Sequence, residues 1–322
     1  MYRQYLTILM IVVFSTIQVV SANTNGVRVA TTFQYLADDV SLLLCSGDEA
    51  YSIVPVGADP HEYSLTPKDV EFLKTSHIII STSHTHLERR IYELIISGEL
   101  NSSLIEVPKL PKVNIRYIPN TNIVNYHAVT YDPDNYIILM ETIARELSRL
   151  RPECSSTYME NLNKVVKQVE KIKKAVELNN LTAVGSSPLT QYAVEWLGVK
   201  VITYLVIDPE APPTPSDISH VEKVLSNRLA TMAVVVDSDS AIDRALNEIA
   251  VKYSIPILKI PSPIAPGSTI DKLETIISNY RNLTLKTADI YEREDYMGLT
   301  LLMTLTSIII LMYALRRVST WK

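Results

Sequence analysis

The chain has 322 residues, of which 47% are hydrophobic and 20% charged, and this composition excludes a disordered or fibrous protein. A chain of this length can bury two hydrophobic cores, so we expect two compact lobes. The formal net charge of −5 provides no basic stripe for neutralising phosphates, which excludes nucleic acid as a partner.

The N-terminus has the order of a secretory signal. Arg3 precedes an uncharged run from Leu6 to Val20, and small residues follow at Ser21 and Ala22. The run contains polar residues and is short for a membrane span, so we favour a signal peptide, residues 1–22, over a signal anchor. The mature chain is then expected to start near residue 23.

Short β-type runs and amphipathic helical stretches alternate after this segment. The expected strands are 27–32, 51–56, 77–82 and 104–107, and the expected helices are 33–44, 67–75 and 87–97. This alternation predicts a doubly wound parallel sheet with helices on both faces. It defines an N-terminal lobe, residues 23–150.

A proline-punctuated loop, 107–126, and two helical stretches, 133–149 and 153–178, come next. The second stretch has apolar residues at every third or fourth position, so one face is buried and the other solvated. We expect residues 151–179 to form a long linking helix that runs along two lobes and joins them. Cys45 and Cys154 are the two cysteines of the chain, and the sequence leaves open whether they pair.

The alternation restarts in a C-terminal lobe, residues 180–290. The expected strands are 181–185, 199–207, 231–236 and 256–260, and the expected helices are 190–196, 217–227, 241–253 and 271–282. The fold class is therefore α/β, with two parallel-sheet lobes whose strand ends face a shared crevice, the usual place for a ligand.

An apolar segment lies near the C-terminus. Residues 297–315 carry no charge, and a helix of these 19 residues is about 28 Å long, enough to cross a hydrocarbon core of roughly 30 Å. Arg316, Arg317 and Lys322 follow, and cytoplasmic flanks are enriched in basic residues. We therefore expect a single-pass transmembrane anchor in the cell membrane, with the main domain extracellular.

The most specific motif spans residues 54–69 (VPVGADPHEYSLTPKD), where Gly57 and Pro60 build a turn that presents His61 before a helix start. An isolated histidine in a polar turn is usually a surface residue. These residues, however, resemble the G-x-D-P-H-x-Y-x-x-x-P-x-D signature of the zinc and manganese substrate-binding proteins of ABC importers, and the resemblance extends to about residue 282. It implies a two-lobed receptor that binds a metal between its lobes, has no enzymatic activity and has ABC permease and ATPase subunits as partners.

The resemblance also implies ligand positions. His61 matches the first ligand, and residues 125–133 (NYHAVTYDP) look like the segment that carries the second, with one extra residue, which points to His127. The third and fourth family positions fall at Ser187 and Ser262, where the ligand has been lost. A serine hydroxyl is a poor ligand for a first-row transition metal.

Two further histidines offer a replacement. Residues 83–88 (SHTHLE) occupy the place of a glycine-containing loop that lines the family's crevice, and they carry His84 and His86. Together with His61 and His127 they would form a tetrahedral nitrogen site, which suits Zn²⁺ and is poor for Mn²⁺. That one or both loop histidines are merely exposed remains an equal alternative. Asp59, Glu62 and Asp208 are the nearest alternative oxygen donors.

The same histidines and carboxylates could in principle belong to an enzyme. A metallohydrolase would need an open metal position with a general base, and the sequence has no H-E-x-x-H motif, nucleophile elbow or glycine-rich phosphate loop. His77 and His220 are read as structural or solvated. The main alternative is a related surface receptor that has abandoned metal and binds another small ligand or acts as an accessory protein. We expect the protein to be a monomer.

Overall fold

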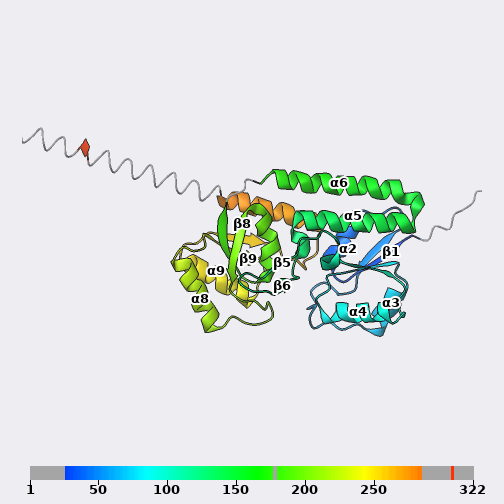
Figure 1. Ribbon diagram of the computed structural model, residues 1–322, viewed down its shortest axis with the longest axis horizontal. Helices are drawn as coiled ribbons and strands as arrows, with labels where there is room; N and C mark the ends of the chain where they lie inside the picture. The colour runs from blue at the N-terminus through cyan, green and yellow to red at the C-terminus, as the bar shows by residue number, and fades with distance from the viewer. Residues whose placement is uncertain (1–25, 177–179, 285–305, 308–322) are drawn as a thin grey trace, which may run out of the picture.

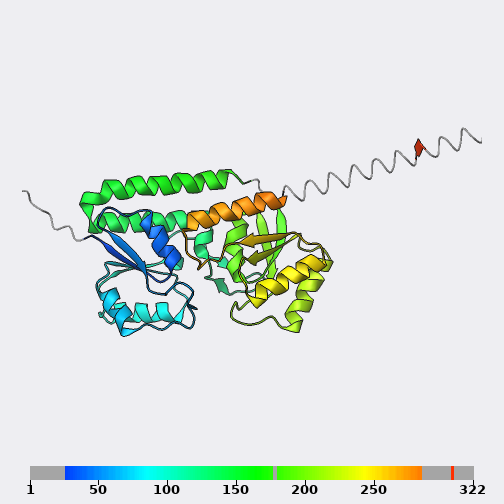
Figure 2. The ribbon, with the colours of Figure 1, turned by 180° about the vertical axis from the view of Figure 1, so that it is seen from behind.

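Two four-stranded parallel sheets form the framework of the computed structural model, which describes residues 26–176, 180–284 and 306–307 (Figures 1 and 2). The two expected parallel sheets and the linking helix are therefore confirmed. The predicted signal peptide lies outside the described residues, and so does the predicted transmembrane anchor except for residues 306–307. None of the helices in the described part of the chain is both long and apolar enough to span a bilayer.

The first sheet has the strand order β2-β1-β3-β4. Its strands are β1 (Arg28–Thr31), β2 (Glu49–Ser52), β3 (Ile78–Ser81) and β4 (Ser103–Glu106), and its helices are α2 (Gln34–Ser41), α3 (Pro67–Lys74) and α4 (His86–Ile96). The inner strand β3 is fully buried, as its run of three isoleucines predicts. Strand β2 begins two residues earlier than expected, because this half-exposed edge strand has a weak apolar pattern and pairs Glu49 with Arg28.

The second sheet has the order β10-β9-β7-β8. Its strands are β7 (Leu181–Gly185), β8 (Val199–Tyr204), β9 (Met232–Val236) and β10 (Ile257–Ile260). Helices α8 (Pro215–Ser226), α9 (Ala241–Lys252) and residues 269–284 match the expected ones closely. The expected helix 190–196 is instead three short pieces, η4 (Pro188–Thr190), α7 (Gln191–Val194) and η5 (Glu195–Leu197).

Two antiparallel helices connect the lobes: α5 (Pro133–Leu150) and, after the short turn η3 (Pro152–Cys154), α6 (Ser155–Lys174). Proline at the start of η3 separates the two helices, because it cannot continue the α-helical hydrogen bonding. Helix α6 runs back over α5 toward the second lobe (Figures 1 and 2). One apolar core includes residues of both sheets, α5 and α6, so the lobes share buried surface.

A small antiparallel hairpin was missed by the sequence analysis. Strands β5 (Arg116–Tyr117) and β6 (Val124–Asn125) lie in the segment expected to be a loop, and 3-10 turns flank them at η1 (Val107–Lys109) and η2 (Val129–Tyr131). The hairpin packs on the second lobe, where the hydroxyl of Tyr192 accepts the N–H of Arg116 at 2.8 Å and donates to the carbonyl of Asn125 at 2.9 Å. A segment of the first half of the chain is thereby fixed to the second half.

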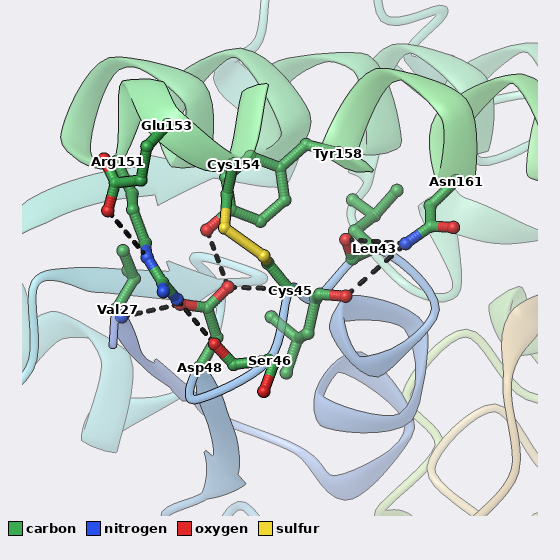
Figure 3. Close-up of a disulfide and its surroundings, with 11 residues drawn as sticks. Val27, Leu43, Cys45, Ser46, Asp48, Arg151, Glu153, Cys154, Tyr158 and Asn161 are labelled. Carbon is green, nitrogen blue, oxygen red and sulfur yellow. Dashed lines mark hydrogen bonds and ion pairs between the residues drawn. A yellow bond between two sulfur atoms is a disulfide. The ribbon is translucent and has the colours of Figure 1, made fainter. Parts of the chain in front are cut away.

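Cys45 and Cys154 form a disulfide that joins the loop after α2 to η3 (Figure 3). Beside it, the carboxylate of Asp48 accepts hydrogen bonds from Arg151 at 2.9 Å and from the Tyr158 hydroxyl at 2.6 Å. Burial alone would raise the pKa of Asp48, but these hydrogen bonds and those of nearby backbone N–H groups outweigh it and lower the pKa. The start of α6 is thus attached to the first lobe by a covalent bond and a buried ion pair.

A second connection joins α2 to the start of the helix over residues 269–284. The buried carboxylate of Asp39 accepts hydrogen bonds from the Thr269 backbone N–H at 2.7 Å, the Thr269 hydroxyl at 2.6 Å and the Tyr136 hydroxyl at 2.9 Å. Burial raises the pKa of Asp39 to about 7, although these hydrogen bonds oppose the shift. An acceptor from one lobe therefore satisfies the helix N-terminus of the other.

Candidate metal site

A cavity of about 660 Å³ lies between the lobes. The first half of the chain contributes His61, His84 and His127 to its wall, and the second half contributes Leu189, Pro209, Glu210, Pro263 and Ile264. These residues come from loops that follow strands, as expected for the ligand crevice of parallel sheets. Aromatic and aliphatic side chains complete the lining, among them Phe33 and Val107.

His61 lies in the loop between β2 and α3. Its backbone N–H donates to Asp59 Oδ1 at 2.8 Å, which closes a tight turn around Pro60. A capping box between Thr66 and Asp69 fixes the end of this loop, where α3 begins. The imidazole of His61 is 28% exposed, so the loop holds it at the entrance of the cavity and not in the core.

His84 lies in the loop between β3 and α4 and is held by Glu88. The backbone N–H of His84 donates to Glu88 Oε2 at 2.9 Å, and His84 Nδ1 lies 3.0 Å from the hydroxyl of Thr82, which itself contacts Glu88 at 2.8 Å. Burial alone would raise the pKa of Glu88, but the adjacent imidazole of His84 and the hydrogen bonds of three backbone N–H groups lower it. Glu88 is therefore ionised and orients this loop.

His127 follows the hairpin strand β6. Its backbone N–H donates to Asn125 Oδ1 at 2.9 Å, while Asn125 Nδ2 donates to Pro188 O and Gln191 Oε1 of the second lobe, each at 2.9 Å. Asn125 is fully buried, so all these polar groups are satisfied away from water. The position of His127 is consequently set by contacts with both lobes.

The three histidine rings lie next to one another. The centre of the His84 ring is 5.0 Å from that of His127 and 5.7 Å from that of His61. Two imidazoles bound to one tetrahedral zinc ion at about 2.1 Å have ring centres roughly 5 Å apart. Within residues 26–176 and 180–284, however, no three His, Cys, Asp or Glu side chains are already arranged around one metal position, so capture of an ion would require small side-chain movements.

Burial lowers the pKa of His84 and brings the pKa of His127 to about 4. For His84, Glu88 opposes the shift and His61 adds to it, whereas both neighbouring histidines add to the shift of His127. Both rings are thus neutral at pH 7. A neutral imidazole keeps the lone pair that a metal ion needs.

The remaining predicted residues divide into two groups. Asp59 and Glu62 line the cavity. His86 is exposed as the first residue of α4, and Ser187 is buried at the start of η4; neither of them nor Ser262 is among the cavity-lining residues. Asp208 also lies outside this lining, and its carboxylate accepts the N–H of Glu210 at 3.0 Å.

Glu210 was not identified from the sequence. It lies in the loop between β8 and α8, and its Oε1 is 2.7 Å from His61 Nδ1. The sequence feature that could have pointed to Glu210 is its place in a loop after a strand of the second lobe, two residues beyond Asp208. His77 and His220 have the structural roles that were expected: His77 Nδ1 accepts the N–H of Arg28 at 2.9 Å, and His220 contacts Thr203 on the second lobe.

Known proteins resemble this chain over most of its length. The family described as zinc-uptake complex component A, periplasmic, matches residues 29–284. The iron ABC transporter substrate-binding lipoprotein of Streptococcus pyogenes serotype M1 is 26% identical over 273 residues, which cover 79% of this chain and 85% of that protein. The manganese ABC transporter substrate-binding lipoprotein of Streptococcus pneumoniae is 27% identical over 256 residues, covering 73% and 79%.

Solved structures share the fold. The manganese-bound periplasmic metal binding protein from Candidatus Liberibacter asiaticus superimposes with a TM-score of 0.64 at 17% identity, covering 79% of this chain and 98% of that one. The periplasmic zinc binding protein from Treponema pallidum has a TM-score of 0.64 at 16% identity, covering 80% and 99%. The arrangement of two lobes and a helical connection is therefore shared well beyond the signature motif.

Proposed function

Because the chain belongs to the zinc-uptake complex component A family, we propose that it is an extracytoplasmic substrate-binding protein that captures a divalent transition metal ion and delivers it to an ABC importer. The observation that carries this proposal is the meeting of three histidine rings, from three separate loops, in the cavity between the lobes. The metal ion is the cargo of the protein, and the permease and ATPase subunits of the importer are its partners.

Zinc is the cargo that these donors favour. The named relatives include proteins for iron, manganese and zinc, so the family alone does not select the ion. The three imidazoles of His61, His84 and His127 suit Zn²⁺, whereas Mn²⁺ prefers carboxylate oxygen. Asp59 and Glu62 line the same cavity and offer additional oxygen donors.

His86 decides whether the proposed site has three histidine ligands or four. Its side chain is exposed at the first turn of α4, so it would join the other histidines only if this turn rearranged. We propose His61, His84 and His127 as the primary ligands and retain His86 as a fourth ligand that a metal ion would have to recruit. Single variants of the two neighbouring histidines distinguish these versions.

The proposed location is the outer face of the cell membrane, with residues 1–22 as a signal peptide and residues 297–315 as the anchor. The disulfide between Cys45 and Cys154 supports an oxidising compartment, since such bonds are rare in the cytosol. The curated relatives are described as lipoproteins, so they too are tethered to a membrane surface.

A second candidate function is a receptor that has abandoned metal. It is favoured by the serines at both lost ligand positions and by the apolar part of the cavity wall, which includes Phe33, Val107, Leu189 and Ile264. Such a lining suits a small organic ligand. In that case the histidines would be hydrogen-bonding groups for this ligand.

Zinc titration of the purified full-length protein tests the proposal. We expect His84→Ala and His127→Ala to weaken zinc binding strongly, because each removes a nitrogen ligand, and Ser187→Ala to leave it unchanged. His86→Ala is the matched control for His84→Ala, and a large effect of His86→Ala would add it to the ligand set. Absence of zinc binding by the unmodified protein would favour the metal-free receptor.

A further inference from the structure

Glu210 is the one ionisable side chain that the second lobe contributes to the described lining of the cavity. The other lining residues from that lobe are apolar: Leu189, Pro209, Pro263 and Ile264. The family's ligand positions in this lobe are occupied by Ser187 and Ser262, which do not line the cavity. Glu210 therefore brings a negative charge of the second lobe directly to the cavity wall, while Asp208, outside the lining, also interacts electrostatically with His127.

The contact of Glu210 with His61 determines which ring nitrogen is free. A carboxylate is only an acceptor, so the hydrogen bond of 2.7 Å between Glu210 Oε1 and His61 Nδ1 places a proton on Nδ1. In the neutral ring, the lone pair is then on Nε2. The contact also joins two loops of different lobes, since His61 follows β2 and Glu210 follows β8.

His84 shows the same arrangement within one lobe. Its Nδ1 faces the hydroxyl of Thr82, which contacts the ionised carboxylate of Glu88, so its Nε2 is likewise the free nitrogen. Glu88 is buried, whereas the side chain of Glu210 is 55% exposed. The partner of His84 is therefore enclosed within its own lobe, whereas the partner of His61 reaches it from the other lobe through a half-exposed contact.

We propose that Glu210 is a positioning residue, which reaches across the cleft to present His61 Nε2 to the metal ion, so that metal binding strengthens the contact between His61 and the loop over residues 205–214. This inference rests on the function proposed above. A carboxylate bonded to a metal-ligating histidine fixes the ring and raises its basicity, and loss of such a partner typically weakens metal binding by about 10- to 100-fold.

The test compares Glu210→Gln and Glu210→Ala with Glu248→Gln in the full-length protein. Glu248 is a matched control because it is an exposed glutamate of the same lobe, on α9, that does not line the cavity. We expect zinc affinity to fall about 10- to 100-fold in Glu210→Ala, less in Glu210→Gln, which keeps the hydrogen bond, and by less than about threefold in Glu248→Gln. Melting curves without metal should coincide for all three variants.

Two further measurements separate positioning from direct ligation and from a merely structural role. The visible absorption spectrum of bound Co²⁺ should be the same in Glu210→Ala as in the unmodified protein, because the ligand set is unchanged. Zinc should slow hydrogen exchange over residues 205–214 in the unmodified protein but not in Glu210→Ala.

Each adverse outcome has a distinct meaning. Equal zinc affinity in Glu210→Ala and the unmodified protein would overturn the inference and leave the proposed function standing. A changed cobalt spectrum would overturn it by making Glu210 itself a ligand. If the unmodified protein bound neither zinc nor cobalt, the proposed function would fail together with the inference.

Discussion

Opening the disulfide between Cys45 and Cys154 should cost the protein a large part of its stability. The bond links residues 109 positions apart, and closing a loop of that length in the unfolded chain removes roughly 5 kcal/mol of conformational freedom. Folded domains are stable by only about 5–15 kcal/mol. The change to make is the double variant Cys45→Ser, Cys154→Ser, which removes the bond and leaves two small side chains.

The surroundings of the bond limit how much of this loss the fold can recover. Asp48 keeps its hydrogen bonds with Arg151 and Tyr158 without the disulfide, so the start of α6 stays attached in the folded state (Figure 3). We therefore expect the main effect on the unfolded state and a free energy of unfolding that is lower by about 3–5 kcal/mol. The slope of the transition with urea should rise, because the unlinked chain exposes more surface.

Urea unfolding followed by circular dichroism measures this difference. The unmodified protein under reducing conditions is the matched control, because it opens the same bond without a substitution and should unfold at the same urea concentration as the double variant. Alkylation without reductant should leave both cysteines unmodified. A double variant whose stability is within about 1 kcal/mol of the oxidised protein would refute the reasoning.

Three other predictions concern stability and location. Burial raises the pKa of Asp39 from 3.8 to about 7, so the folded state binds this proton more tightly than the unfolded state. The free energy of unfolding should therefore fall as the pH rises from about 4 to about 7, and Asp39→Asn should flatten this part of the profile. Lys272 faces Asp39, but its pKa, lowered by burial to about 8, places its titration above that window. Gly185→Ala should lower the melting temperature by several degrees, because a Cβ there would lie 2.8 Å from the ring of Tyr204. An unchanged melting temperature would contradict this prediction and would mean that the surrounding side chains can shift to make room. Truncation before residue 297 should release a monomeric protein from the membrane fraction, and retention of the truncated protein in that fraction would contradict the anchor.

Much of the fold could be predicted because the apolar runs and helix caps in the sequence fall where the strands and helices of the two sheets lie. The buried strands β3 and β9 are continuous apolar runs, and the helices α3 and α8 begin with capping residues that are visible in the sequence. The hairpin β5–β6 was missed, since each of its strands has two residues and its stability comes from contacts with the second lobe. Such contacts leave no periodicity in the sequence.

The histidines of the candidate site could be selected from the sequence for a related reason. His61 and His127 stand in recognisable segments, and His84 was identified from its place in a crevice-lining loop. Glu210 could not be identified, because its partner His61 lies in the other lobe, far away in the sequence, and a half-exposed glutamate in a loop is ordinary. The disulfide likewise depends on a distance in space that the spacing of the cysteines does not reveal.

The attachment of α6 at its first turn has a mechanical consequence. A helix of 20 residues is about 30 Å long, so a tilt of 10° at its beginning would displace its far end by roughly 5 Å. The disulfide and the Asp48–Arg151 ion pair resist such a tilt at the first turn, and further along the helix Gln168 donates to Glu274 Oε1 at 2.8 Å. The two lobes should therefore move little relative to one another, and capture and release of a ligand should involve small movements of the loops around the cavity.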